Sequence, residues 1–205
     1  MTNTLRGFVL LFVSLVSLPA FSQGYTTLKE RAPLQVAADK IEVTAVFSYT
    51  CPYCYQLEPL LQTWANQQQD DVQLVYLPAA FNKQWEHLAR AYYIMDTLNL
   101  TEQAHLPLFN AIHQENVNLG SQRALEKFFE RYGIKSEQVS QLYSSFGVES
   151  RLRQDMARLK AYRITGVPAL VIDGRYVVDG NSAGSLANML KVADKLVADL
   201  RKSKQ

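Results

Sequence analysis

Residues 41–62 read IEVTAVFSYTCPYCYQLEPLLQ, and the rest of the architecture follows from them. The first half is an apolar run rich in β-branched residues, which is typical of a buried strand, and the second half changes to helical spacing. Cys51 and Cys54, the two cysteines of the chain, stand at the junction. Cα atoms on successive turns of a helix lie about 5 Å apart, which suits a disulfide bond. The sequence therefore predicts a pair of thiols that forms and breaks a disulfide with little backbone movement.

The segments on either side of this stretch predict a small sheet with one hairpin. The expected strands are 25–29, 40–47, 72–77, 166–172 and 175–178. The tight turn Asp173-Gly174 joins the last two strands as a hairpin. A closing amphipathic helix, capped by Ser182 or Ser185, runs to about Arg201. The strands on either side of the cysteine helix are expected to pair in parallel.

Between residues 82 and 164 the pattern is helical and contains no β-rich run. The expected helices are 83–98, 101–114, 121–132, 136–146 and 149–161. Thr101 and Ser121 fit N-caps, and Gly133 and Gly147 fit C-terminal stops. Without this block the order is strand, cysteine helix, strand, hairpin and helix, which is the order of the thioredoxin fold. We therefore predict an α/β chain, with a thioredoxin-like domain at 23–81 and 163–205 and an all-helical insertion at 82–162.

The first 22 residues have the composition of a secretory signal peptide. Arg6 supplies a basic n-region, an apolar segment follows it, and Ala20 and Ser22 fit the small positions before a cleavage site. The apolar segment is shorter than the roughly 20 residues of a transmembrane helix, although a retained N-terminal anchor is an alternative. We expect export and a mature chain that begins near Gln23.

Charge and cysteine spacing argue against several classes of function. The formal net charge is +2, which gives no electrostatic basis for a nucleic-acid partner. A disulfide across three positions closes almost no loop, so it would brace the structure very little. A structural zinc site needs four ligands, and His87, His105 and His113 do not have metal-ligand spacing beside the cysteines. We expect no metal, no cofactor beyond the disulfide itself, and histidines that are exposed or partly packed in the helical block.

Cys51 is the expected nucleophile, because it precedes the first helical turn, where free N–H groups and the helix dipole favour an anion. Pro52 suits the first helical position, where its missing donor costs nothing. Cys54 lies one turn deeper and is expected to be buried and to act as the resolving thiol. A low pKa makes Cys51 a good leaving group, which favours donation of the disulfide to a substrate.

Two stretches, FSYTCPYCYQLE at 47–58 and GVPAL at 166–170, closely resemble the DsbA family of periplasmic disulfide oxidoreductases. The residues alone leave open whether Pro168 follows an ordinary trans bond. The resemblance implies a cis Val167-Pro168 bond beside the Cys51–Cys54 disulfide, with the backbone before the proline pairing with an extended substrate peptide. It also implies a periplasmic location, exported folding proteins with thiols as substrates, and reoxidation by a membrane quinone reductase of the DsbB type.

Three features differ from the well-studied members of that family. Tyr53 stands where they carry a histidine, Ala45 stands where they carry a buried acid, and the strand at 72–77 lacks their lysine. The pair Pro52-Tyr53 is found in glutaredoxins, whose potentials lie at about −200 to −230 mV against about −120 mV for DsbA. Both residues are therefore expected to tune the potential. An oxidase is the main hypothesis, and a milder reductase or isomerase and a peptide-binding chaperone with a thioredoxin fold are the alternatives.

Overall fold

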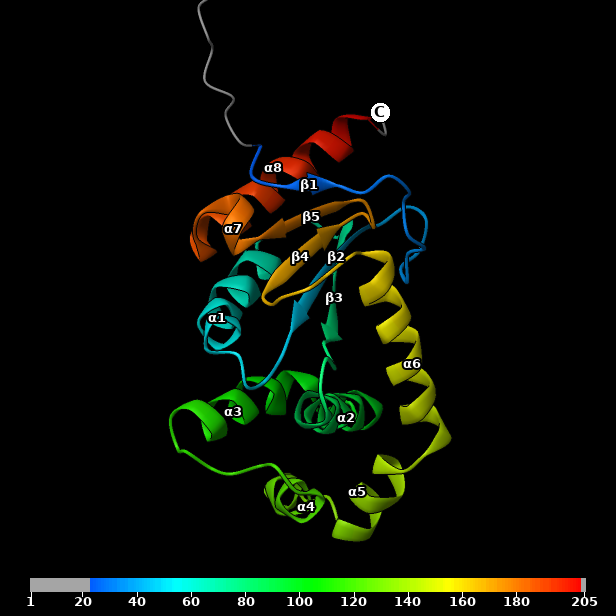
Figure 1. The fold of residues 1–205 in the computed structure, drawn as a ribbon, viewed down its shortest axis with the longest axis vertical. Coiled ribbons are helices and arrows are strands. Elements are labelled where there is room, and N and C mark those ends of the chain that lie inside the picture. Colours follow the sequence, from blue (N-terminus) through cyan, green and yellow to red (C-terminus); the bar gives the residue numbers. More distant parts are fainter. Residues whose placement is uncertain (1–22, 204–205) are drawn as a thin grey trace, which may run out of the picture.

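The computed structural model describes residues 23–203, so the expected signal peptide at 1–22 lies outside the described residues. The strands are β1 (Thr26–Thr27), β2 (Ile41–Phe47), β3 (Val72–Pro78), β4 (Ala169–Ile172) and β5 (Tyr176–Asp179). The helices are α1 (Pro52–Asn66), α2 (Lys83–Thr97), α3 (Thr101–His113), α4 (Gln122–Glu130), α5 (Ser136–Tyr143), α6 (Phe146–Ala161), α7 (Gly180–Ala183) and α8 (Leu186–Ser203). The helices α2–α6 run between β3 and β4, as Figure 1 shows.

The strands form one mixed sheet in the order β1-β5-β4-β2-β3. The expected parallel pairing is confirmed, because β2 and β3 run side by side from Ile41 opposite Val72 to Phe47 opposite Pro78. The other neighbours in the sheet are antiparallel. Asp173 and Gly174 both have positive φ, 55° and 62°, so the hairpin turn is of the kind that matches the twist of its strands. The cysteine helix therefore follows a central strand of a thioredoxin-like sheet.

The sheet is covered on both faces, and the alternation of side chains along β2 shows why. Odd-numbered residues of β2 such as Val43 pack with α1 and α8 in one buried cluster. Val46 packs with Leu159 and Tyr162, near the end of α6, in another. Alternate residues of a strand point to opposite faces, so a strand with both faces covered is apolar throughout. Figure 1 shows α1 and α6 on opposite sides of the sheet.

A buried ion pair ties α6 to the sheet. Arg158 Nη2 donates to Glu42 Oε1 of β2 over 2.8 Å and also to the hydroxyl of Tyr162 over 3.0 Å. The Glu42 side chain is fully buried, so an unpaired charge there would be costly. This contact joins the last of the inserted helices to a central strand.

The helices α2–α5 gather at the end of the sheet where β2 and β3 point, as Figure 1 shows. Their core is aromatic, with Phe109 and Phe129 fully buried. The same cluster contains Phe47 at the end of β2 together with Cys51 and Cys54. The two cysteines therefore lie at the junction between the sheet and the inserted helices. Within residues 23–203, no helix is long and apolar enough to cross a bilayer.

The predicted caps are partly confirmed. Ser121 caps α4, where its hydroxyl accepts from the Ala124 N–H over 3.2 Å. Ser185 accepts from the Asn188 N–H over 3.1 Å at the start of α8. Ser182 instead forms a capping box with Asp179 around α7. Of the two serines, Ser185 therefore caps the closing helix as expected, whereas Asp179 is the N-cap of α7 and Ser182 is its N3 partner.

Three predictions about the helical block are wrong. Thr101 is not the N-cap of α3, because that position belongs to Leu100 and the helix begins at Thr101 itself. Gly147 does not stop a helix, since it is the second residue of α6, which the hydroxyl of Ser145 caps. His105 is not near the surface, because only 1% of it is exposed. Its ring packs against Phe47 and other rings of the aromatic core, and its Nδ1 shares a hydrogen bond of 2.6 Å with the Tyr49 hydroxyl.

Candidate functional site

Cys51 occupies the N-cap position of α1. Its backbone is extended, with φ −86° and ψ 114°, and Pro52 fills the first turn. The Cys51 Sγ accepts a hydrogen bond from the backbone N–H of Cys54 over 3.3 Å. A thiolate at this position is stabilised by otherwise free N–H groups of the first turn. The local sequence, a strand followed by Cys-Pro, therefore places one sulfur at the positive end of a helix.

The two sulfurs have very different acidities. A hydrogen bond from the Cys54 thiol lowers the pKa of Cys51 to about 7, and the N–H groups of Cys54 and Tyr53 add to this against the opposing effect of burial. Burial raises the pKa of Cys54 far above its usual range, and the neighbouring Cys51 sulfur raises it further. Cys51 is 8% exposed and Cys54 is 4% exposed. Near neutral pH, ionisation of the pair therefore takes place on Cys51, the more accessible of the two sulfurs.

The loop before β4 brings Val167 and Pro168 beside Cys51. The Val167-Pro168 peptide bond is cis, as the family resemblance implies. The Val167 carbonyl oxygen lies 3.6 Å from the Cys51 Sγ, within reach of a weak S–H donor. The two motifs singled out in the sequence are 116 positions apart and meet at this contact. Their meeting defines the candidate site.

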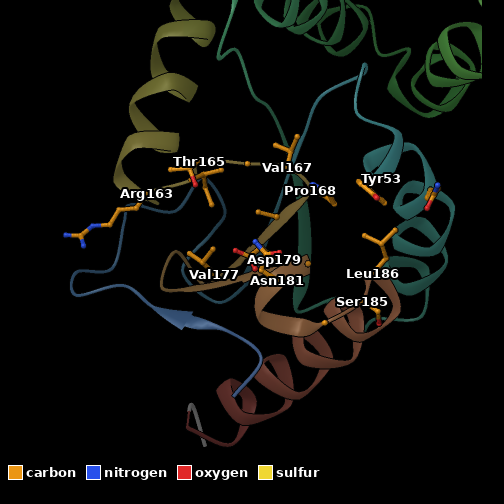
Figure 2. Close-up of a pocket in the computed structure, with 16 residues that line it drawn as sticks. Tyr53, Arg163, Thr165, Val167, Pro168, Val177, Asp179, Asn181, Ser185 and Leu186 are labelled. Carbon is orange, nitrogen blue, oxygen red and sulfur yellow. The ribbon is translucent and has the colours of Figure 1, made fainter. Parts of the chain in front are cut away.

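A groove of about 610 Å³ opens next to the sulfurs. Its walls come from α1, the loop before β4, β5 and the start of α8. The residues that line it are Tyr53, Gln56, Arg163, Ile164, Thr165, Gly166, Val167, Pro168, Ala169, Val177, Asp179, Gly180, Asn181, Gly184, Ser185 and Leu186. Figure 2 shows Tyr53 and Leu186 on one side, Thr165 on the other, and Asp179 between them. The cysteines themselves do not line the groove, which starts at their neighbours Tyr53 and Pro168.

The site residues expected from the sequence thus come together, but the far wall of the groove was not anticipated. Tyr53 is 62% exposed and presents its ring at the rim. Between the two sides of the groove, Asp179 and Asn181 lie where β5 passes into α7, and the Asp179 carboxylate accepts from the Ser182 N–H over 2.7 Å. A cluster of turn-forming and capping residues directly after the hairpin, DGNSAGS at 179–185, was the available signal.

The histidines have structural partners. His113 Nε2 lies 2.8 Å from the Tyr49 carbonyl oxygen, and its ring stacks on Tyr55 at 4.9 Å. His87 contacts the Tyr143 hydroxyl at 2.7 Å, and burial holds its pKa below the ordinary value. Within residues 23–203, no three histidine, cysteine, aspartate or glutamate side chains gather as metal ligands would.

Comparison with known proteins gives one consistent result. The sequence model of the DSBA-like thioredoxin domain matches residues 77–191. The thiol:disulfide interchange protein DsbA of Pseudomonas aeruginosa is 32% identical over 202 residues, which is 96% of each chain. The protein of the same name from Azotobacter vinelandii is 33% identical and covers 86% of this chain and 82% of its own length.

Solved structures agree with these sequence matches. The crystal structure of Pseudomonas aeruginosa DsbA superposes with a TM-score of 0.83 at 31% identity, covering 88% of this chain and 94% of that one. The oxidoreductase DsbA from Xylella fastidiosa gives a TM-score of 0.81, also at 31% identity, with 87% and 95% of the two chains covered. The similarity in fold therefore extends over most of this chain.

Proposed function

Because this chain belongs to the DsbA family of thiol:disulfide oxidoreductases, we propose that Cys51 and Cys54 are its catalytic residues and that their disulfide is donated to substrate proteins. The observation that carries the proposal is the contrast between the two sulfurs at the start of α1. Cys51 loses its proton near pH 7, whereas Cys54 strongly prefers its proton. The contrast supports Cys51 as the leaving group and Cys54 as the resolving thiol, and neither role needs a cofactor.

The exchange takes place in two displacements. A substrate thiolate attacks the Cys51 Sγ of the disulfide, the bond between Cys51 and Cys54 breaks, and Cys54 leaves with the electron pair and takes up a proton. A second substrate thiolate then attacks the substrate sulfur of the mixed disulfide, and Cys51 leaves as a thiolate. A leaving thiol of low pKa departs faster, so the Cys51 environment drives the second step. The substrate gains a disulfide and the protein becomes a dithiol.

Val167 and Pro168 are proposed to bind the substrate backbone, and Pro52 and Tyr53 to tune the redox pair. The Val167 carbonyl already points at the Cys51 sulfur, so an extended peptide in the groove would pass directly over it. Peptide backbone is common to all proteins, so such contacts favour broad selectivity. The exposed ring of Tyr53 offers the same peptide an apolar face.

The cellular setting is also a proposal. We propose export through the signal peptide at 1–22, a periplasmic location, and folding exported proteins with thiols as substrates. A membrane quinone reductase of the DsbB type is the proposed reoxidant. The thioredoxin-like domain is proposed to consist of 23–81 and 163–205, with 82–162 as the helical insertion.

The Cys51 pKa favours a second candidate function, that of a milder oxidant, a reductase or an isomerase. The value of about 7 matches thioredoxin, whose nucleophile has a pKa of about 7, rather than the value of about 3.5 found in DsbA. A less stable thiolate gives a less oxidising disulfide, which would suit a milder oxidant, or a reductase or isomerase. The exposed Tyr53 at the position of a thiolate-stabilising histidine points the same way.

The experiment uses three forms of the protein and a reduced, unfolded substrate protein. The oxidised wild type should convert substrate thiols to disulfides with matching loss of its own disulfide. Cys51→Ala should abolish this oxidation, and Cys54→Ala should accumulate mixed disulfides through Cys51. A peptide-binding chaperone would instead suppress aggregation equally well in all three forms without oxidising substrate, and that result would overturn the proposal.

A further inference from the structure

A second pocket adjoins the groove beside the cysteines. Its volume is about 600 Å³, and it shares two lining residues with the groove, Asn181 of α7 and Gly184 just after that helix. From there this cavity, which we call the α8 pocket, continues along α8 as far as Lys195. Figure 2 shows Ser185 and Leu186, which lead into α8, at the edge of the groove. The proposed path of the substrate therefore has a possible continuation on the other side of α7.

The ridge between the two cavities is built from small residues. Its sequence is GNSAG at 180–184, and a Cβ added to Gly180 or Gly184 would meet no atom within 4 Å. Gly184 has φ +81° and ends α7 in the left-handed conformation, which glycine adopts without strain. The chain thus turns tightly and leaves open space above the turn. An extended peptide can cross this ridge without displacing a large side chain.

The α8 pocket has a wall of backbone that is tied to the sheet. Gly24 lines the pocket with φ +77°, and a Cβ at this position would lie 2.8 Å from a methyl group of Val192. The backbone of Gly24 therefore lies directly against α8. Two residues later, Thr26 pairs with Val177 of β5. The pocket is thus formed by packed elements on both sides.

The charged side chains that line the α8 pocket are two lysines. Lys191 and Lys195 are four positions apart on α8, so they lie on the same face of the helix. Among residues 23–203, no aspartate or glutamate lines the pocket, and Lys191 has no ion-pair partner. Lys195 pairs with Asp199 over 3.2 Å, but both side chains are more than half exposed, and such pairs are weak. Asp194, the other acid of α8, accepts from Gln68 instead. The pocket therefore favours an anionic group.

The distance along α8 indicates how much peptide would span the two cavities. A helix rises about 1.5 Å per residue, so the stretch from Leu186, at the groove, to Lys195 is about 13 Å long. An extended chain advances about 3.3 Å per residue, so about four residues of peptide cover this stretch. A segment whose cysteine reacts at Cys51 would reach the lysines several residues farther along its own chain.

We propose that the α8 pocket is a second subsite for substrate proteins, which binds aspartate or glutamate side chains several residues away from the reacting cysteine. This inference rests on the proposed function, because the peptide must already lie in the groove. Two observations carry it, the continuity of the α8 pocket with the groove and the positive charge of its lining. Backbone contacts at Val167 accept any sequence, whereas Lys191 and Lys195 add a preference for acidic segments.

The test is a competition between two peptides for a limiting amount of the oxidised protein. Both peptides contain two cysteines, and they differ only in a pair of glutamates or a pair of glutamines. The pair is placed four, six or eight residues from the nearer cysteine, on its N-terminal or its C-terminal side. Mass spectrometry of the oxidised products gives the ratio of the two kcat/KM values, and oxidised glutathione alone gives the ratio of the intrinsic thiol reactivities.

After correction for intrinsic reactivity, the glutamate peptide should be preferred at least threefold at low ionic strength for one or more placements. The preference should vanish in about 1 M salt, where charges are screened beyond about 3 Å. It should also vanish in the double variant Lys191→Gln/Lys195→Gln. The matched control is Lys127→Gln/Lys135→Gln, which makes the same change in net charge at exposed positions of the helical insertion and should keep the preference. A ratio below threefold at every placement, or a preference that survives in Lys191→Gln/Lys195→Gln, would overturn the inference.

An anionic lipid surface is the other occupant that two exposed lysines could serve. Binding to phosphatidylglycerol vesicles that is lost in Lys191→Gln/Lys195→Gln, without any peptide preference, would assign this face to a membrane and overturn the inference. Equal oxidation of the glutamate and glutamine peptides would leave the proposed function intact. Failure to oxidise any of the peptides would instead refute the proposed function.

Discussion

Replacing Cys54 with alanine should raise the pKa of Cys51. The hydrogen bond from the Cys54 thiol is the largest influence that lowers the Cys51 pKa to about 7. The backbone N–H groups of Cys54 and Tyr53 remain in the variant, and burial still opposes the charge. The change therefore removes the main support of the thiolate and leaves its geometry at the N-cap of α1 intact.

The size of the effect follows from the strength of that hydrogen bond. A hydrogen bond to a charged group is worth about 1.5–3 kcal/mol, and a thiol is a weak donor, so the lower end applies. One pKa unit corresponds to about 1.36 kcal/mol. Cys51 in Cys54→Ala should therefore titrate about one unit higher, near pH 8. Cys54→Ser keeps a hydroxyl donor at the same place and should titrate close to the wild type.

Ultraviolet absorbance of the thiolate during a pH titration of each reduced protein measures these values. A pKa near 7 in Cys54→Ala would refute the reasoning, because it would mean that the helix terminus alone holds the anion.

The lowered pKa of Cys51 should also make the stability of the reduced protein depend on pH. A pKa lowered in the folded state stabilises the reduced protein above the unfolded thiol's pKa near 9, and the gain is lost as the pH falls through about 7. Relative to Cys54→Ala, the reduced wild type should thus gain stability between about pH 7 and pH 8, the two folded-state pKa values, and the difference should stay level above that.

Three further changes test the fold and the groove. Arg158→Ala should lower the free energy of unfolding by about 3–5 kcal/mol in urea titrations, because it leaves Glu42 charged and buried; a loss below about 1 kcal/mol would contradict this. Asn181→Trp should fill the groove and raise the KM for an unfolded protein substrate severalfold without slowing the reaction with glutathione, whereas equal effects on both would argue against peptide binding there. Gly174→Ala should cost about 1–3 kcal/mol, since its Cβ would lie 2.5 Å from a backbone oxygen at φ +62°; Gly133→Ala has a similar φ but open space and should cost less.

The fold could be predicted from the sequence where local patterns determine it. The apolar run before Cys51, the turn at Asp173-Gly174 and the helical spacing of 82–162 each report on neighbouring residues, and the structure agrees with them. Helix boundaries are harder to predict, because neighbouring residues compete to cap or end each helix. Ser145 outcompetes the stop expected at Gly147 because its hydroxyl caps α6. The cap expected at Thr101 fails because Leu100 occupies that position.

The site could be predicted only as far as its two motifs. Cys51 and Pro168 each lie in a short sequence motif, and these motifs predict their roles. The sequence alone does not show that Cys51 contacts the residue before Pro168. Asp179 and Asn181 also line the groove, but polar residues directly after a hairpin are ordinarily assigned to a surface turn. Their place in the groove depends on which segments far apart in the sequence meet there, and local pattern does not encode that.

The equilibrium reduction potential of the Cys51–Cys54 pair, measured against glutathione, tests the account most directly. The role of disulfide donor requires a dithiol that is favoured more strongly than the dithiol of thioredoxin, so the potential should lie at about −230 mV or higher. A potential at or below about −270 mV, the value for thioredoxin, would contradict the assignment of this protein as a disulfide donor.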